Sequence, residues 1–288
     1  MSNLRKLTAL LLALLLLLSL TACGEEDSRP VIAVSIPPEA GLVRAVAGEN
    51  FRIVTMVPPG NSPETYAPTP REMIDFASAS VYFSIGVPVE QTALLPSLGK
   101  DTRLVSLAET AATAYPELTI HGERDPHIWL SPKRVALMVA RIADELSALD
   151  PANAATYRQN ADAYLEALAE ADAYVRAAIS DAGVADLIVY HPAFGYLCDE
   201  YGLTMHALER DGREPTASEM AALVDLAKEK GIRTVFYQAE TDGRGARAFA
   251  EEIGGTAVML SPLAENYIEN LRSMADAIAV AVREEVAP

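Results

Sequence analysis

Short apolar runs alternate with amphipathic stretches along most of the chain. Runs such as "VIAVSI" and "DLIVYH" are rich in valine, isoleucine and leucine and have the length of buried strands. We expect strands at 31–36, 51–57, 81–86, 103–108, 186–191, 233–238 and 256–260. Apolar residues at helical spacing predict helices at 38–48, 71–79, 131–149, 192–202, 216–231, 245–255 and 266–286. Strands that alternate with helices in this way predict parallel sheets covered by helices.

One long stretch in the middle of the chain lacks this alternation. From Pro151 to about residue 181 the sequence is rich in alanine and keeps an apolar helical stripe, formed by Tyr157, Ala161, Tyr164, Leu168 and Ala171. A helix of about 30 residues is roughly 45 Å long, which is more than one small domain needs. We therefore predict an α/β fold in which two parallel-sheet α/β lobes are joined by one long rigid helix. The expected domains are an N-terminal lobe at 31–150, the linking helix at 151–182 and a C-terminal lobe at 183–288.

The first residues carry a targeting signal. Arg5 and Lys6 precede an unbroken apolar run that ends at Cys23, and this order predicts a secretory signal peptide at 1–22. The letters "LTAC" have the form of a bacterial lipobox, in which cleavage leaves a lipid on the cysteine. We expect Cys23 to be the lipidated first residue and 23–30 to be a tether, with an uncleaved membrane anchor as the alternative. The protein is then extracytoplasmic and lipid-anchored to the cell membrane, at the cell surface or in the periplasm.

The charge balance and the cysteine count restrict the partners. The chain has 23 basic and 40 acidic residues, with a formal charge of −17. A surface this acidic repels nucleic acid and anionic lipid and attracts cations. We therefore expect no nucleic-acid partner and a membrane contact through the lipid alone. Cys198 is the only cysteine besides Cys23, so lipidation of Cys23 leaves no disulfide, and the fold depends on its own core.

Three potential metal ligands follow predicted strands. Glu64 comes after the strand at 51–57, His191 ends the strand at 186–191, and His127 lies between a strand and a helix. In open α/β sheets, ligands bind beyond the carboxyl ends of the strands. Two imidazoles and a carboxylate from separate loops suit a zinc ion. The prolines on both sides of His127 limit the freedom of its backbone, so less entropy is lost on binding.

Four motifs, in their order and spacing, resemble those of one known family. The segments "GNSPETYAPTP", "DPHIWLSP", "VYHPAFGYLCDEYGL" and "PLAENYIENL" are similar to those of the zinc/manganese substrate-binding lipoproteins of ABC importers, the cluster A-I or TroA-like family. The similarity covers nearly the whole mature chain. It implies two lobes joined by a rigid helix, with one metal ion bound between them and delivered to the membrane subunits of an ABC permease. It also implies a monomeric binding protein that is not an enzyme.

The resemblance implies metal ligands residue by residue. Glu64 stands at the first ligand position, where the family usually has histidine, and His127 and His191 match the second and third positions. Two imidazoles favour zinc, whereas the carboxylate oxygen of Glu64 favours manganese. In the family, histidine at the third position accompanies zinc and glutamate accompanies manganese. We expect Zn(II) to be the transported ligand, with Mn(II) as the alternative.

The fourth ligand is less clearly specified. In the family it is often an aspartate, but Ser261 occupies that position here, and serine is a poor zinc ligand. Glu240 is our candidate because it is charged and follows the strand at 233–238, with Gln238 and water as alternatives. The two remaining histidines, His121 and His206, are expected to be exposed or structural.

Two other classes of function remain open from the residues. A zinc-dependent hydrolase would hold its metal with three protein ligands and a water, a number that Glu64, His127 and His191 satisfy. The chain lacks His-Glu-x-x-His and Gly-x-Ser-x-Gly, which disfavours that hypothesis. A surface adhesion protein stabilised by a structural metal is the other alternative.

Overall fold

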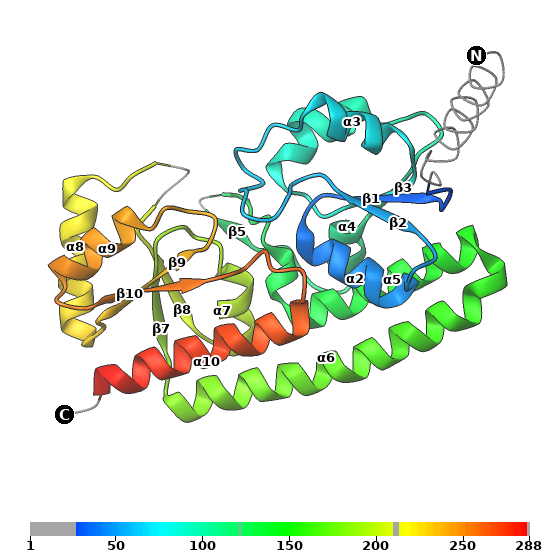
Figure 1. Cartoon of the computed structure of the whole chain (residues 1–288). Coiled ribbons are helices and arrows are strands. Elements are labelled where there is room, and N and C mark those ends of the chain that lie inside the picture. Colours follow the sequence, from blue (N-terminus) through cyan, green and yellow to red (C-terminus); the bar gives the residue numbers. More distant parts are fainter. Residues whose placement is uncertain (1–26, 121, 210–212, 287–288) are drawn as a thin grey trace, which may run out of the picture.

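The computed structural model describes residues 27–120, 122–209 and 213–286 (Figure 1). The predicted signal peptide at 1–22, the predicted lipidation site Cys23 and the first residues of the tether lie outside this range. None of the helices in the described residues has the length and apolar character needed to cross a membrane.

The N-terminal lobe contains a parallel four-stranded sheet with the strand order β2-β1-β3-β4. Its elements are β1 (Val31–Val34), α2 (Pro37–Ala47), β2 (Arg52–Thr55), α3 (Pro70–Ala77), β3 (Ala79–Ser84), β4 (Arg103–Ser106), α4 (Leu107–Ala112) and α5 (Pro132–Leu149). A short antiparallel hairpin precedes α5 and consists of β5 (Thr119–Ile120) and β6 (Glu123–Arg124). Short helical turns occupy Glu90–Leu94, Leu95–Ser97, Ile128–Leu130 and Pro151–Asn153.

The C-terminal lobe contains a second parallel sheet, with the order β10-β9-β7-β8. Its elements are β7 (Asp186–Val189), α7 (Gly195–Tyr201), β8 (Thr204–Ala207), α8 (Ala217–Lys230), β9 (Thr234–Gln238), α9 (Arg244–Glu252), β10 (Thr256–Leu260) and α10 (Tyr267–Val286). When the strands of each lobe are numbered along the chain, both sheets have the order second, first, third, fourth. The direction of the strand order thus reverses beside β1 in one lobe and beside β7 in the other, where α/β sheets bind ligands.

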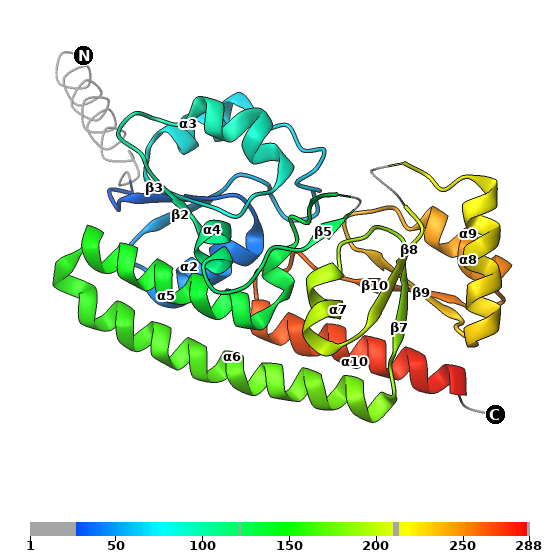
Figure 2. The ribbon, with the colours of Figure 1, turned by 180° about the vertical axis from the view of Figure 1, so that it is seen from behind.

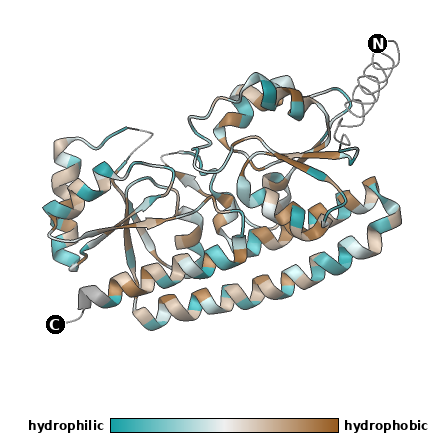
Figure 3. Cartoon of the chain, viewed as in Figure 1, coloured by the Kyte–Doolittle hydropathy of each residue, from teal (hydrophilic) through white to brown (hydrophobic). Residues whose placement is uncertain are grey.

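The long helix α6 (Ala154–Ala182) runs along the base of both lobes, and it contacts α5 along its first half and α10 along its second half (Figures 1 and 2). Its buried stripe consists of Tyr157, Ala161, Leu168, Ala171, Val175 and Ile179. One apolar core extends from Val34 in the first sheet through Leu168 to Ile278 in α10. Figure 3 shows strands that are mostly hydrophobic and an α6 of mixed character, as expected for a helix that buries one face.

The fold class expected from the sequence is confirmed, because two parallel-sheet α/β lobes flank a long helix. The expected strand at 103–108 ends at Ser106, whose side chain accepts a hydrogen bond from the backbone N–H of Glu109 and so begins α4. Neither β8 nor the hairpin was predicted from the sequence. The domain boundaries at 150 and 182 stay predictions.

The two lobes are joined by direct contacts as well as by α6. The side chain of Trp129, which is fully buried, donates a hydrogen bond of 2.9 Å to the carbonyl of Pro262 in the other lobe. Beside it, Ser131 donates a hydrogen bond of 2.7 Å to Glu200 in α7. The loop at 126–132 is therefore held at the border between the lobes.

Candidate metal centre

Glu64 lies in the loop between β2 and α3. The backbone of this loop is fixed by a hydrogen bond of 3.1 Å from the N–H of Val89 to the carbonyl of Pro63. The N–H of Glu64 itself donates to the Ser62 hydroxyl at 3.3 Å. The rigid Pro63 and these two hydrogen bonds hold the backbone of Glu64, and with it the carboxylate, at the edge of the N-terminal lobe. Its side chain is 32% exposed.

His127 begins the helical turn that precedes α5. The carboxylate of Asp125, which is fully buried, accepts hydrogen bonds from both the backbone N–H of His127 at 2.9 Å and its Nδ1 at 2.8 Å. A carboxylate can only accept in this contact, so Nδ1 carries the hydrogen and Nε2 faces the gap between the lobes. The neighbouring Trp129 packs against the imidazole, with 5.4 Å between the ring centres.

His191 follows β7, the central strand at which the order of the second sheet reverses. Its Nδ1 lies 2.7 Å from Oε2 of Glu209, which follows the neighbouring strand β8. This contact leaves Nε2 of His191 directed toward the N-terminal lobe. Each of the two histidines thus has one ring nitrogen bonded to a carboxylate, an arrangement that fixes the ring orientation at metal sites.

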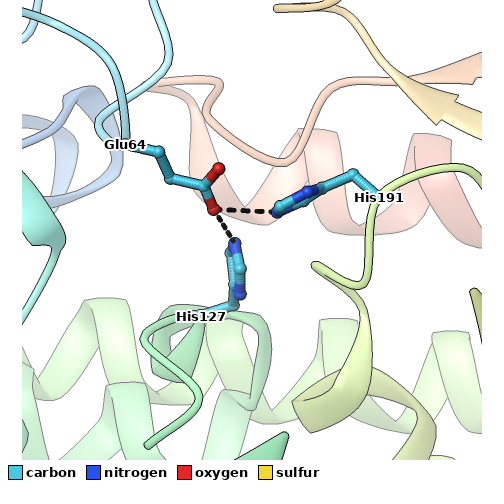
Figure 4. A group of neighbouring side chains, drawn as sticks. All are labelled: Glu64, His127 and His191. Carbon is cyan, nitrogen blue, oxygen red and sulfur yellow. Dashed lines mark ion pairs between the residues drawn. The ribbon is translucent and has the colours of Figure 1, made fainter. Parts of the chain in front are cut away.

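The three side chains converge between the lobes (Figure 4). Oε1 of Glu64 lies 2.9 Å from Nε2 of His191 and 3.9 Å from Nε2 of His127. One ligand atom from each residue lies within 4.8 Å of the others. Both histidines are buried, and their rings meet edge to face with 5.5 Å between their centres. The structure therefore brings together the three residues that the sequence analysis selected from distant loops.

The charges of these groups are strongly coupled. Burial alone would raise the pKa of Glu64, but the hydrogen bond from His191 and the charges of both imidazoles lower it below its usual value. Burial disfavours the charged ring of His191, yet the hydrogen bonds with Glu209 and Glu64 outweigh this effect and raise the pKa of His191 to about 9. A divalent cation at this place would take over the role of the proton on His191.

The donor set fits a tetrahedral zinc ion. Zinc bonds to nitrogen and oxygen of about 2.0–2.1 Å place neighbouring ligand atoms roughly 3.3 Å apart. The observed separations of 2.9 and 3.9 Å bracket that value. Shifts of a fraction of an ångström, within the reach of the partly exposed Glu64 side chain, would equalise them. The three residues are candidate ligands, and the fourth position of the shell stays open.

The proposed fourth ligand is not part of this cluster. Glu240 follows β9, and in the part of the chain that the structure describes its Oε2 is buried without a hydrogen-bond partner. Burial raises the pKa of Glu240. Gln238 is buried at the end of β9, and Ser261 lies next to the Pro262 carbonyl that receives Trp129. A ligand role for Glu240 stays a prediction.

The other residues considered lie elsewhere or outside the described range. His206 in β8 pairs with Asp186 at 2.7 Å, which is a structural contact away from the cluster. Cys198 is a free, buried thiol in α7, and burial raises its pKa to about 12. His121 lies outside the described residues.

Two residues that contact the histidines were missed from the sequence. Asp125 precedes His127 by two positions, and an aspartate commonly bonds the backbone two residues on, so the "DPH" letters contained the signal. Glu209 had no comparable signal, because β8 was not predicted and its alignment beside β7 was therefore unknown.

Comparison with known proteins identifies relatives over nearly the whole chain. The family model described as "Zinc-uptake complex component A periplasmic" matches residues 32–281. The zinc-binding lipoprotein AdcA of Streptococcus pneumoniae is 29% identical over 302 aligned residues, which cover 93% of this chain and 60% of AdcA. The chain thus spans about three fifths of the length of that relative. A Chlamydia muridarum protein, whose name assigns metal binding only provisionally, is 27% identical over 89% of this chain and 93% of its own length.

Solved structures agree in fold. The crystal structure of ZnuA is 32% identical, with a TM-score of 0.82 over 88% of this chain and 100% of that chain. A zinc-bound deletion mutant of ZnuA is 33% identical, with a TM-score of 0.81 over 88% and 98%. The zinc-binding protein TroA of Treponema pallidum is 21% identical with a TM-score of 0.81 over 88% and 99%, a likeness that concerns the fold alone.

Proposed function

The chain belongs to the zinc-uptake complex component A family, and from this premise we propose that it captures Zn(II) outside the cytoplasm and delivers it to an ABC permease. Members of this family are metal-binding components of ABC uptake systems, and they are solute-binding proteins instead of enzymes. The ion is Zn(II), its ligands include Glu64, His127 and His191, and a lipid on Cys23 anchors the protein to the membrane. The protein acts as a monomer that binds one ion between its lobes.

The observation that carries the proposal is the convergence of Glu64, His127 and His191 from three separate loops. Both imidazoles present Nε2 to the same point, and each is held there by a carboxylate on Nδ1. A side-chain arrangement this specific, located between two lobes of an acidic protein, suits a captured divalent cation.

Zinc is the ion that this donor set favours. Two imidazole nitrogens suit zinc, and a single carboxylate does not shift the balance to the oxygen-rich shell that manganese prefers. The zinc-binding relatives support the same assignment. Elemental analysis of the protein isolated from its own cells, grown with both metals, should give about one zinc per chain. Isolated protein that contained manganese in place of zinc would contradict the zinc assignment.

Direct titration tests the ligand set. The metal-stripped mature chain should bind one Zn(II), and His127→Ala and His191→Ala should each weaken binding by at least about 100-fold, because even loss of an outer-shell partner weakens metal binding by 10–100-fold. Glu64→Ala should also weaken binding, and His206→Ala provides the control because it lies outside the cluster. If both His127→Ala and His191→Ala bound Zn(II) with wild-type affinity, the proposed site would be wrong.

Glu240 remains our candidate for the fourth ligand because its buried Oε2 lacks a hydrogen-bond partner among the described residues. A small rearrangement of the loop after β9 on metal loading would bring in its carboxylate, and water fills the position otherwise. Glu240→Ala should weaken zinc binding by at least about 10-fold if the carboxylate coordinates. An unchanged affinity would assign the position to water or Gln238.

The lipid anchor at Cys23 is the last part of the proposal. Its support is the lipobox letters at the end of the apolar leader. Mass spectrometry of the amino-terminal peptide should find a lipidated Cys23, and Cys23→Ser should move the protein from the membrane fraction to the soluble fraction. An unmodified Cys23 within an intact leader would favour an uncleaved anchor.

A further inference from the structure

Glu209 reaches the metal centre through the alignment of two strands. In the second sheet, Val189 of β7 is paired with Ala207 of β8. The backbone bonding continues beyond the strands, since the N–H of Leu208 donates to the Val189 carbonyl at 2.9 Å, and that of Glu209 donates to the Tyr190 carbonyl at 2.8 Å. Two positions beyond the last pair, the two strands therefore place His191 and Glu209 side by side.

The contact between the two side chains selects one form of the imidazole. Oε2 of Glu209 lies 2.7 Å from Nδ1 of His191, and a carboxylate at that distance accepts the hydrogen of Nδ1. Nε2, on the opposite side of the ring, lies 2.9 Å from Oε1 of Glu64 (Figure 4). The nitrogen that faces the other lobe is thus the one left for a metal, and Glu209 fixes both its identity and its direction.

The two histidines differ in how they are supported. Asp125 is fully buried and lies two residues from His127, so the same short loop supplies the ring and its support. Glu209 comes from another strand, and its side chain is 20% exposed. It lines a pocket of about 380 Å³ together with residues that include Pro192 and Met205. Because the carboxylate borders this open space and its backbone bond does not depend on the side chain, its removal should leave the fold intact.

We infer that Glu209 is a positioning residue that holds the His191 ring for zinc, and that it sets the affinity of the centre without touching the ion. This inference rests on the proposed function. Without the carboxylate, the ring can rotate about its side-chain bonds and present either nitrogen. Outer-shell partners of this kind typically change metal affinity by about 10–100-fold.

Three substitutions of Glu209 distinguish its effect on the orientation of the His191 ring from the effect of its negative charge. Glu209→Ala removes the acceptor, Glu209→Gln keeps an acceptor of the same length without the charge, and Glu209→Asp keeps the charge on an arm shorter by one methylene. Zinc affinity, measured against a chelator of known strength, should fall about 10–100-fold in the Ala and Asp variants and remain within about fivefold of wild type in the Gln variant. Glu251→Gln, an exposed position on α9, removes one negative charge elsewhere and should bind like wild type.

A spectroscopic signature distinguishes positioning from a general loss of stability. In zinc-loaded wild type with ¹⁵N-labelled histidine, nuclear magnetic resonance should show a protected Nδ1–H on His191 and zinc on Nε2. The Ala variant should lose that protected hydrogen or show mixed nitrogens, while His127, supported by Asp125, should be unchanged and serve as the internal reference.

Two results would overturn the inference. One is a Glu209→Ala variant that keeps wild-type affinity and the Nδ1–H signal of His191. The other is the reverse order of the variants, with Asp retained and Gln weakened, because charge and not ring orientation would then set the affinity. Failure of the proposed function itself looks different, since wild type would then bind no zinc and His191→Ala would change nothing.

Discussion

At the scale of single residues, a proton competes for the place where zinc is proposed to bind. When no metal is bound, His191 makes short contacts with carboxylates through both ring nitrogens, Nδ1 with Glu209 and Nε2 with Glu64. These two contacts raise the pKa of His191 to about 9 although its burial acts in the opposite direction. Zinc binding to Nε2 therefore releases a proton at neutral pH.

The raised pKa predicts a pH dependence of zinc affinity. Between pH 7 and 9 the proton on His191 must leave before zinc binds, so the apparent affinity should rise about tenfold per pH unit and level off above pH 9. Chelator competition at several pH values measures this slope. An affinity that is already constant above pH 7, as expected for a histidine with a pKa near 6.5, would contradict the prediction.

The same shift affects the stability of the metal-free protein with the opposite sign. Because the pKa of His191 is higher in the folded chain than in the unfolded one, its contribution is fully present below about pH 6.5 and is lost as the pH rises through about 9. The free energy of unfolding without metal should therefore decline over the range in which zinc affinity increases.

Single residues of this centre were predictable to different degrees. His127 and His191 were selected because each follows a strand and each belongs to a recognisable motif. Glu64 was selected although it departs from the family pattern, and the structure places it beside both rings. Glu209 was beyond prediction because its role depends on the alignment of β8 with β7, and the sequence does not specify that alignment.

At the scale of elements, helix α2 lies very close to the loop that leads into α10, where the lobes meet. A Cβ atom added to Gly41 in α2 would lie 2.0 Å from the carbonyl oxygen of Glu265, just before α10. That carbonyl also accepts the N–H of Tyr267 at 2.9 Å. On the surface beside it, Arg44 and Glu265 form an ion pair at 3.0 Å. The contact requires glycine because backbone atoms, which cannot rotate away, occupy the space.

Substitution of this glycine should reverse the usual rule for helices. Gly→Ala in an open helix stabilises by about 1 kcal/mol, but Gly41→Ala should lower the free energy of unfolding by about 1–3 kcal/mol, because α2 and the loop before α10 must move apart. Ala45→Gly in the same helix should lower it by about 1 kcal/mol through helix propensity alone. Chemical denaturation measures both changes. A Gly41→Ala variant that is more stable than wild type would show that the loop before α10 moves aside at little cost in free energy.

Among the elements, a clear apolar pattern decided what the sequence could predict. The helix α6 was evident because its apolar stripe repeats over many turns. The strand β8 has the same length as β1 and β7, but its sequence, TMHA, includes Thr204 and His206 and lacks the unbroken apolar run of those strands. Each strand of the hairpin has only two residues, which is too short for any pattern. Pairing with neighbours is what makes these segments strands.

At the scale of the whole molecule, contacts other than a metal hold the lobes together. The Trp129 side chain donates a hydrogen bond to the opposite lobe, Ser131 donates one to Glu200, and the apolar core runs through α6 into α10. The sequence indicated two α/β lobes, but that the ligand loops face each other depends on how the lobes are rotated about α6. Only the resemblance to a known family carried that information.

Removal of the metal should therefore leave the molecule folded. We expect the chelated protein to keep its circular dichroism spectrum and to retain a radius of gyration within about 1 Å of the zinc-loaded form in X-ray scattering. Free zinc at about 100 times its dissociation constant should add about 2.7 kcal/mol to the free energy of unfolding by mass action. Loss of cooperative unfolding on chelation would instead assign the metal a structural role, as in the adhesion hypothesis.

In the described part of the chain, the polypeptide passes from the first lobe to the second only once, through α6 (Figures 1 and 2). Helix α6 ends at Gly183, which lies in an exposed turn just before the second lobe. A backbone cut there would create two polypeptides, one ending in α6 and the other containing α10, and the contact of α6 with α10 would bind them as a heterodimer. Glu64 and His127 would then belong to one polypeptide and His191 to the other. If the two polypeptides are expressed from separate genes, zinc should therefore strengthen their association.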